Sequence, residues 1–360
     1  MTEETVKSIK KRAKKEAPKV STKEAHLSTG STLLNLACSG NAFGGFMKGS
    51  YNYIVGDSTS GKTWLAMTCF AEASNNAFFK DHRLIYDDVE NGCLMDIQHY
   101  FGKSTFEKIE PPAGDKENPE YSSTIEDFYF NVDDAIKAGK PFIYVLDSMD
   151  GLTSSSEIDK FDETKDAMRK GKQVAGSYGD GKAKKNSEYL RRVTNELAKT
   201  DSILIIISQT RDNIGFGFEK KTRSGGRALR FYATLEMWSA RKGKINKSVK
   251  GKQRTIGIIS EIGVKKNRIT GVESKVEIPI YHSYGIDDVE SCINYLMDEG
   301  HWSKMGQNLA AHEFDHKGTV AALIQKIEDE GRENELRELT GQVWQDIKEA
   351  CALKRKKRYE

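Results

Sequence analysis

Apolar and polar residues follow two alternating patterns along the chain, which predict strands and helices in turn. Residues 62–72 and the spacing of Ile125, Phe128, Val132 and Ile136 predict two helices, the second with one apolar face. Short apolar runs rich in β-branched and aromatic residues predict buried strands at 51–55, 84–87, 142–146 and 203–208. Because strands and helices alternate, we expect an α/β fold with an open, mostly parallel central sheet.

Beyond residue 230 the pattern changes, first to strands without helices and then to helices alone. Apolar runs at 232–238, 255–265 and 276–280 predict an antiparallel extension of the sheet. Further on, two sets of residues have helical spacing: Val320, Leu323, Ile324 and Ile327, and Leu336, Leu339, Val343 and Ile347. We therefore expect an arm (1–27), a core (28–285) and a small C-terminal helical module (286–360) that ends in a basic tail.

The N-terminal arm has its own pattern. Val6, Ile9, Ala13 and Ala17 predict a short helix that ends before Pro18, and residues 1–20 carry seven basic against three acidic side chains. Two interpretations remain open for this arm, a solvated tail and a segment that docks on a neighbouring subunit.

Composition excludes several classes of protein. The 360 residues carry 56 basic and 53 acidic side chains, a net charge of +3, and no run approaches 18 uninterrupted apolar residues, which excludes a membrane protein. The N-terminus lacks the apolar stretch of a signal peptide. The cysteines are scattered and never spaced C-x-x-C, so buried reduced thiols and a cytoplasmic location are expected rather than disulfides or a zinc site; they are Cys38, Cys69, Cys93, Cys292 and Cys351.

A phosphate-binding loop is predicted between the first strand and the first helix of the core. The stretch fits G-x-x-x-x-G-K-[ST], and consists of Gly56, Asp57, Ser58, Thr59, Ser60, Gly61, Lys62 and Thr63. Small residues let backbone N–H groups surround a phosphate at a helix N-terminus. Lys62 would neutralise the β- and γ-phosphates, and the Thr63 hydroxyl would bind Mg²⁺.

Acidic residues end two of the predicted strands. Asp147 follows the apolar run 142–146, at the strand edge where a ligand of Mg²⁺ would lie, although an acid there could also cap the next segment. Glu90 follows the run 84–87 and would activate a water molecule, with Asp88 adjusting its surroundings. Together these residues predict a nucleotide-hydrolysing site.

Several motifs, in this order, resemble the RecA recombinase family, its phage members included. The similarity covers roughly residues 28–294. It is carried by the lead-in to the phosphate loop (28–36 and 44–50), by Asp147-Ser148 with 151–158, by Ile206-Ile207-Ser208-Gln209-Thr210-Arg211, and by Ser224-Gly225-Gly226-Arg227-Ala228-Leu229-Arg230-Phe231-Tyr232-Ala233. The resemblance implies a RecA-like ATPase core that uses ATP and Mg²⁺.

The resemblance also implies residue roles. Glu90 would be the water-activating glutamate, and Gln209 would detect the γ-phosphate and move the adjoining DNA-binding loop. Lys266 and Arg268 would reach across a subunit interface to the ATP of a neighbour, where a cation stabilises charge on the transferred phosphoryl group. Hydrolysis would then require a helical filament of this chain. From the residues alone, these two cations are simply an exposed strand edge.

Two segments lie where the family has its mobile DNA-binding loops. Residues 165–192 hold nine basic against three acidic side chains, and could equally form a solvated face; residues 211–230 hold six basic against two acidic, with apolar residues among glycines. Basic groups would bind phosphates and aromatic groups would stack on bases without reading sequence. The candidate DNA contacts are Arg169, Lys170, Lys172, Lys182, Lys184, Lys185, Arg211, Ile214, Phe216, Phe218, Lys220, Lys221, Arg223, Gly225, Gly226 and Arg227.

The sequence thus predicts an ATP-dependent, single-strand DNA-binding recombinase that pairs homologous duplex DNA and exchanges strands, in the cytoplasm of a bacterium or of a phage-infected host. Single-strand-binding and loader proteins are further expected partners. Two alternatives remain open: a ring-forming helicase or motor on the same core, and a mediator that binds ATP and DNA without exchanging strands.

Overall fold

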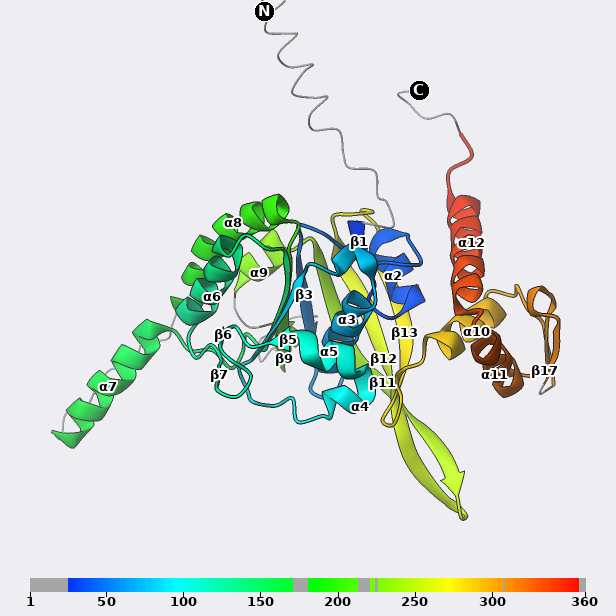
Figure 1. Cartoon of the computed structure of the whole chain (residues 1–360), viewed down its shortest axis with the longest axis horizontal. Coiled ribbons are helices and arrows are strands. Elements are labelled where there is room, and N and C mark those ends of the chain that lie inside the picture. Colours follow the sequence, from blue (N-terminus) through cyan, green and yellow to red (C-terminus); the bar gives the residue numbers. More distant parts are fainter. Residues whose placement is uncertain (1–24, 171–180, 213–220, 224–225, 307, 356–360) are drawn as a thin grey trace, which may run out of the picture.

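The computed structural model describes residues 25–170, 181–212, 221–223, 226–306 and 308–355, so the predicted helix of the N-terminal arm lies outside the described residues. A ten-stranded mixed sheet crosses the molecule (Figure 1). In spatial order its strands are β14 (Gly285–Ile286), β13 (Ser274–Tyr281), β12 (Lys252–Asn267), β11 (Leu235–Val249), β3 (Tyr51–Gly56), β9 (Ile203–Asp212), β8 (Phe142–Asp147), β4 (Arg83–Asp88) and β5 (Ile109–Glu110), with β10 (Lys221–Arg223) beside β9.

Strand direction changes at β11. From β11 through β3, β9, β8 and β4 to β5 neighbouring strands are parallel, whereas β12, β13 and β14 continue the sheet in antiparallel pairs. The predicted α/β fold with a mostly parallel sheet and an antiparallel extension is confirmed. One boundary was wrong: β11 begins at Leu235 instead of residue 232, because Arg227–Tyr232 forms the short helix α9.

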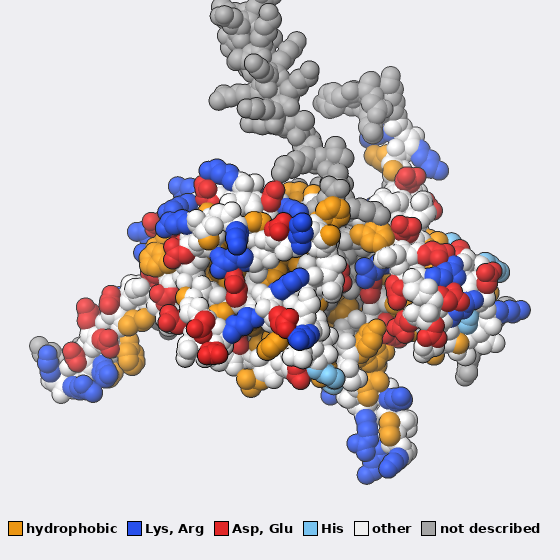
Figure 2. Space-filling view, in the orientation of Figure 1, with side chains coloured by type: hydrophobic (Ala, Val, Ile, Leu, Met, Phe, Trp, Pro, Cys, Tyr) orange, Lys and Arg blue, Asp and Glu red, His pale blue; other side chains and the backbone are white. Residues whose placement is uncertain are grey.

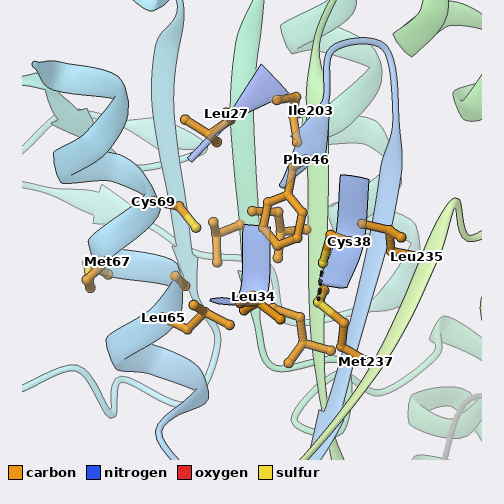
Figure 3. Packing of buried hydrophobic residues seen from close by; sticks show 14 of the residues in the cluster. Leu27, Leu34, Cys38, Phe46, Leu65, Met67, Cys69, Ile203, Leu235 and Met237 are labelled. Carbon is orange, nitrogen blue, oxygen red and sulfur yellow. Dashed lines mark hydrogen bonds between the residues drawn. The ribbon is translucent and has the colours of Figure 1, made fainter. Parts of the chain in front are cut away.

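Helices cover both faces of the sheet and bury two apolar cores. Side chains alternate along a strand, so in β3 Ile54 enters one core while Tyr53 and Val55 enter the other. The first core lies under α2 (Thr32–Ser39) and α3 (Lys62–Ser74), and Figure 3 shows Cys38 of α2 in contact with Met237 of β11. The second lies under α6 (Ile125–Lys137), α8 (Gly181–Thr200) and α9. Burial on both faces explains the continuous apolar runs.

Smaller elements connect these layers. They are β1 (His26–Leu27), β2 (Phe46–Met47), η2 (Ala77–Phe79), α4 (Ile97–Phe101), α5 (Lys103–Lys108), β6 (Ala113–Gly114) and β7 (Pro119–Glu120). A search of the described helices for one long and apolar enough to cross a membrane finds none.

Two elements project from the core (Figure 1). The helix α7 (Ser155–Arg169) has no buried residue, and Ile158, Phe161 and Met168 are exposed on it. The other projection is the far end of the β11–β12 hairpin, where Figure 2 shows a concentration of Lys and Arg side chains. Residues 241–254 hold seven basic side chains and no acidic one.

The C-terminal module has an apolar core of its own. Its helices are α10 (Asp288–Asp298), α11 (Val320–Glu330) and α12 (Glu333–Cys351), and the last two carry the predicted apolar residues. The module was expected to be helical, but it also contains a three-stranded antiparallel sheet of β15 (Lys304–Met305), β16 (Asn308–Ala311) and β17 (His316–Thr319), with η3 (His312–Phe314) between the last two. These strands are too short to have a clear apolar period. Cys351, expected to be buried, is exposed.

Candidate nucleotide site

The backbone of the loop between β3 and α3 depends on two of its glycines. Gly61, which precedes α3, has φ +93°, and a Cβ at Gly56 would lie 2.4 Å from the carbonyl oxygen of Ser239. These positions therefore require glycine. The carbonyl oxygen of Ser60 accepts hydrogen bonds from Ser239 Oγ at 3.0 Å and Ser260 Oγ at 2.7 Å. The loop thus has the backbone that phosphate binding at a helix N-terminus needs.

Lys62 lies over this loop. Its Nζ donates to the carbonyl oxygens of Gly56 at 2.9 Å and Asp57 at 2.7 Å. Burial lowers the pKa of Lys62, and the carboxylates of Asp147 and Asp57 oppose that shift. The ammonium group therefore lies against the backbone of the loop predicted to bind phosphate.

Thr63 and Asp147, the two predicted ligands of Mg²⁺, are in contact with each other. The Thr63 hydroxyl donates to Asp147 Oδ2 at 2.7 Å, and Tyr86 OH donates to the same oxygen at 3.2 Å. Burial raises the pKa of Asp147. A hydroxyl and a carboxylate are oxygen donors of the kind that Mg²⁺ prefers. The described residues include no cluster of three His, Cys, Asp or Glu arranged around a metal.

Glu90 is held between two neighbouring strand ends. Its Oε1 accepts from Ser148 Oγ at 2.7 Å and from Gln209 Nε2 at 3.3 Å. Strand register explains the meeting, because Gln209 lies opposite Gly56 and Asp88 lies opposite Asp147 at the carboxyl edge of the sheet. The structure therefore brings the three predicted strand ends together.

Asp88, which was expected to adjust the surroundings of Glu90, contacts the backbone of the turn that follows β4. Its two carboxylate oxygens accept from the backbone N–H groups of Gly92, at 3.0 Å, and Cys93, at 3.1 Å. These bonds shape the turn that presents Glu90. Asp88 thus acts on Glu90 through the backbone.

Asp150 is a site residue that the sequence analysis missed. Its Oδ2 accepts from Ser208 Oγ at 2.6 Å and from the backbone N–H of Gln209 at 2.7 Å. The available signal was an acid three residues beyond Asp147. Its partners are 58 and 59 residues further along the chain, which no local pattern reveals.

Lys266 and Arg268 lie away from the phosphate loop of their own chain. Arg268 N donates to the carbonyl oxygen of Thr234, and Thr234 N donates to that of Tyr51, which places Arg268 at the opposite end of β3 from Gly56. Both side chains donate to the carbonyl oxygen of Phe231, at 2.8 Å for Lys266 and 2.6 Å for Arg268. Burial and the neighbouring Arg268 charge lower the pKa of Lys266 to about 8. Their contact with a neighbour's nucleotide stays a prediction.

The predicted DNA contacts are distributed over several elements. Arg169 ends α7 and Lys170 follows it, and both are exposed, as is Lys184 on α8. Lys182 donates to the carbonyl oxygen of Leu152 at 2.6 Å, and Lys185 lies 3.7 Å from Glu126, so these two cations already have protein partners.

Other predicted contacts lie around β9 and β10. Arg211 lies on β9, Lys221 and Arg223 lie on β10, and Gly226 precedes Arg227, the exposed first residue of α9. Some predicted contacts lie outside the described residues: Lys172, Ile214, Phe216, Phe218, Lys220 and Gly225.

The sequence of this chain is similar to a protein-family model and to several known proteins, all of them RecA. The model for the RecA N-terminal domain matches residues 123–287. Protein RecA of Cytophaga hutchinsonii is 28% identical over 290 residues, which cover 78% of this chain and 70% of that protein. Protein RecA of Bartonella bacilliformis is 29% identical over 285 residues, covering 78% and 72%. Protein RecA of Chlorobaculum parvum is 27% identical over 290 residues, with the same two shares of 78% and 72%.

Proposed function

Because this chain belongs to the RecA family, we propose that it is an ATP-dependent recombinase that forms filaments on single-stranded DNA. It pairs that strand with homologous duplex DNA and exchanges strands. It works in the cytoplasm of a bacterium or of a phage-infected host, together with single-strand-binding and loader proteins.

The contact of Glu90 with Gln209 at the edge shared with the phosphate loop carries this proposal. The loop N–H groups and Lys62 would bind the phosphates, and Thr63 and Asp147, which are hydrogen-bonded to each other, would hold Mg²⁺. Bound ATP supplies the phosphoryl group. Glu90, oriented by Ser148, takes a proton from the attacking water. Gln209 donates to Glu90 Oε1 from β9, so a change at the γ-phosphate reaches the strand that leads to the second DNA segment.

The position of Lys266 and Arg268 supports the assembly of several copies of this chain into a filament. Their end of β3 is remote from the loop in the same chain, so a role at a phosphate has to be performed at the site of a neighbouring copy. A cation supplied in this way stabilises the charge that develops during phosphoryl transfer. Hydrolysis then depends on filament formation.

The ATPase rate with and without single-stranded DNA tests the proposal, followed by a strand-exchange assay. We expect DNA to stimulate hydrolysis and the chain to exchange strands, and Lys62→Ala to abolish both activities; the matched control is Lys80→Ala, which removes an exposed lysine after η2. Stimulation without exchange would instead identify a mediator. Rings seen by electron microscopy with ATP and DNA would identify a motor.

A further inference from the structure

Thr210 is the first residue of β9 beyond its pairing with β3. The pairing of β9 with β3 ends where Gln209 lies opposite Gly56, and from Thr210 onward β9 pairs with β10. In that pairing Thr210 lies opposite Arg223. Arg223, a later residue of the predicted DNA segment 211–230, therefore lies beside Thr210, where that segment begins.

The side chain of Thr210 contacts the phosphate loop. Its hydroxyl donates a hydrogen bond to Asp57 Oδ1, although the two residues are 153 positions apart. The carbonyl oxygen of the same Asp57 accepts from Lys62 Nζ at 2.7 Å and from Ser60 Oγ at 2.7 Å. Any rearrangement of Lys62 around a phosphate thus acts on the residue that holds Thr210.

Asp150 limits which residues of β9 can move when the phosphate loop changes. Its carboxylate fixes Ser208 through the side chain and Gln209 through the backbone. Displacement transmitted from the loop is therefore concentrated at Thr210 and the residues after it. Since successive side chains of a strand point to opposite sides, Gln209 reaches Glu90 while Thr210 reaches Asp57.

We propose that Thr210 is a positioning residue that transmits the state of the phosphate loop to the base of the β9–β10 hairpin through its hydrogen bond to Asp57. This inference rests on the proposed function, in which nucleotide and DNA binding are coupled. It adds a second connection beside the one through Gln209. Because coupling between two ligands is reciprocal, loss of the bond weakens the effect of nucleotide on DNA affinity and of DNA on nucleotide affinity by the same factor.

The experiment compares full-length wild type with Thr210→Val, Thr210→Ala and Thr210→Ser. Thr194→Val is the matched control, because the Thr194 hydroxyl donates within α8 to the carbonyl oxygen of Leu190 at 2.8 Å. Fluorescence anisotropy gives the Kd of labelled oligothymidine without nucleotide and with saturating Mg²⁺ and AMP-PNP. The reverse titration gives the Kd of labelled AMP-PNP with and without oligothymidine. Melting curves show that each variant is folded.

We expect the nucleotide-induced change in DNA Kd to shrink about three- to tenfold in Thr210→Val and Thr210→Ala, the size of the net contribution of one typical intramolecular hydrogen bond. Thr210→Ser and Thr194→Val keep the wild-type change, and the reverse titration gives the same factor. If Thr210→Val and Thr210→Ala both keep it, the inference is overturned while the proposed function stands. If wild type itself shows no nucleotide-dependent DNA binding, the proposed function is overturned and this inference with it.

Discussion

Gln209 Nε2 lies 3.3 Å from Glu90 Oε1, so the residue predicted to detect the γ-phosphate is hydrogen-bonded to the residue predicted to activate water. Gln209 lies on β9 and Glu90 lies in the turn after β4, 119 positions earlier in the chain. In the proposed function, water activation by Glu90 and γ-phosphate detection by Gln209 therefore meet at this contact. Changing either residue should affect the partner's task as well as its own.

Glu90→Gln should separate nucleotide binding from hydrolysis. The amide keeps an acceptor oxygen for Ser148 but cannot take a proton, so we expect the DNA-stimulated ATPase rate to fall about 10²- to 10⁴-fold. Binding of AMP-PNP should stay within about threefold, since Glu90 is not part of the phosphate cradle. Glu107→Gln, on the exposed surface of α5, is the control and should behave as wild type. A Glu90→Gln variant that hydrolyses ATP normally would contradict the assignment.

Asp147→Asn should raise the Mg²⁺ concentration needed for half-maximal ATPase activity by at least about tenfold, because a neutral amide replaces the anionic oxygen that meets Thr63. Tyr86→Phe is the matched control. It removes the other hydrogen bond to Asp147 Oδ2 and leaves the carboxylate in place, so a change below about threefold is expected. A Mg²⁺ titration at saturating ATP measures both. Equal effects of the two substitutions would assign Asp147 a structural role instead.

Mixing two inactive variants should restore hydrolysis if cations act between subunits. Lys266→Ala with Arg268→Ala removes the predicted cations, and Glu90→Gln removes the predicted base in the other variant. At equal amounts, about a quarter of the interfaces would pair an intact base with intact cations, and that share of wild-type activity should return.

Thermal melts accompany the mixing experiment, because both cations also bind the carbonyl oxygen of Phe231. Lys275→Ala, an exposed change on β13, is the control. If the mixture remains as inactive as its two components, the cations serve their own chain only.

Phe216→Ala with Phe218→Ala should weaken binding of single-stranded DNA by about tenfold or more, since each aromatic ring lost removes a stacking surface. Nucleotide affinity should not change. Filter binding or fluorescence anisotropy at constant salt measures the affinity for single-stranded DNA, and titration with AMP-PNP measures the affinity for nucleotide. Phe130→Ala, which removes an exposed ring from α6, is the control. An unaltered DNA affinity would refute the assignment.

Asp287→Asn should stabilise the chain at neutral pH. Burial, together with the Glu290 and Glu328 charges, raises the pKa of Asp287 to about 6. The folded-state pKa lies above the unfolded value, so the ionised carboxylate destabilises the fold above pH 6 and protonation relieves this as the pH falls.

Asparagine keeps the acceptor that receives the N–H of Glu290 at the start of α10, at 2.8 Å. We therefore expect Tm to rise by about 2–4 °C at pH 7.5 and by about half as much at pH 5, because the carboxyl of the unfolded chain is still ionised there. Asp298→Asn, at the exposed end of α10, is the control. A gain that is the same at both pH values would come from some other cause.

Local chemistry made much of this protein predictable. The phosphate loop could be predicted from the sequence because its backbone requires glycine at two positions of the motif. Gly61 has a positive φ, and Gly56 lies too close to the Ser239 carbonyl oxygen to carry a Cβ. Buried strands such as β8 could be predicted because helices cover both faces of the sheet, so these strands are continuous apolar runs in the sequence. The short strands of the C-terminal module were not predicted, since β16 and β17 have four residues each and their pairing, not their pattern, defines them.

The sequence by itself determined the phosphate loop, the buried strands and the acids that end them, because periodicity and backbone freedom are properties of neighbouring residues. Only the tertiary structure decided which strand ends meet. Strand register placed Gln209 beside Gly56, brought Asp150 and Thr210 to the site, and put Lys266 and Arg268 toward the opposite end of the sheet. Register arises from packing two cores across many strands at once, so no single segment of the chain contains it.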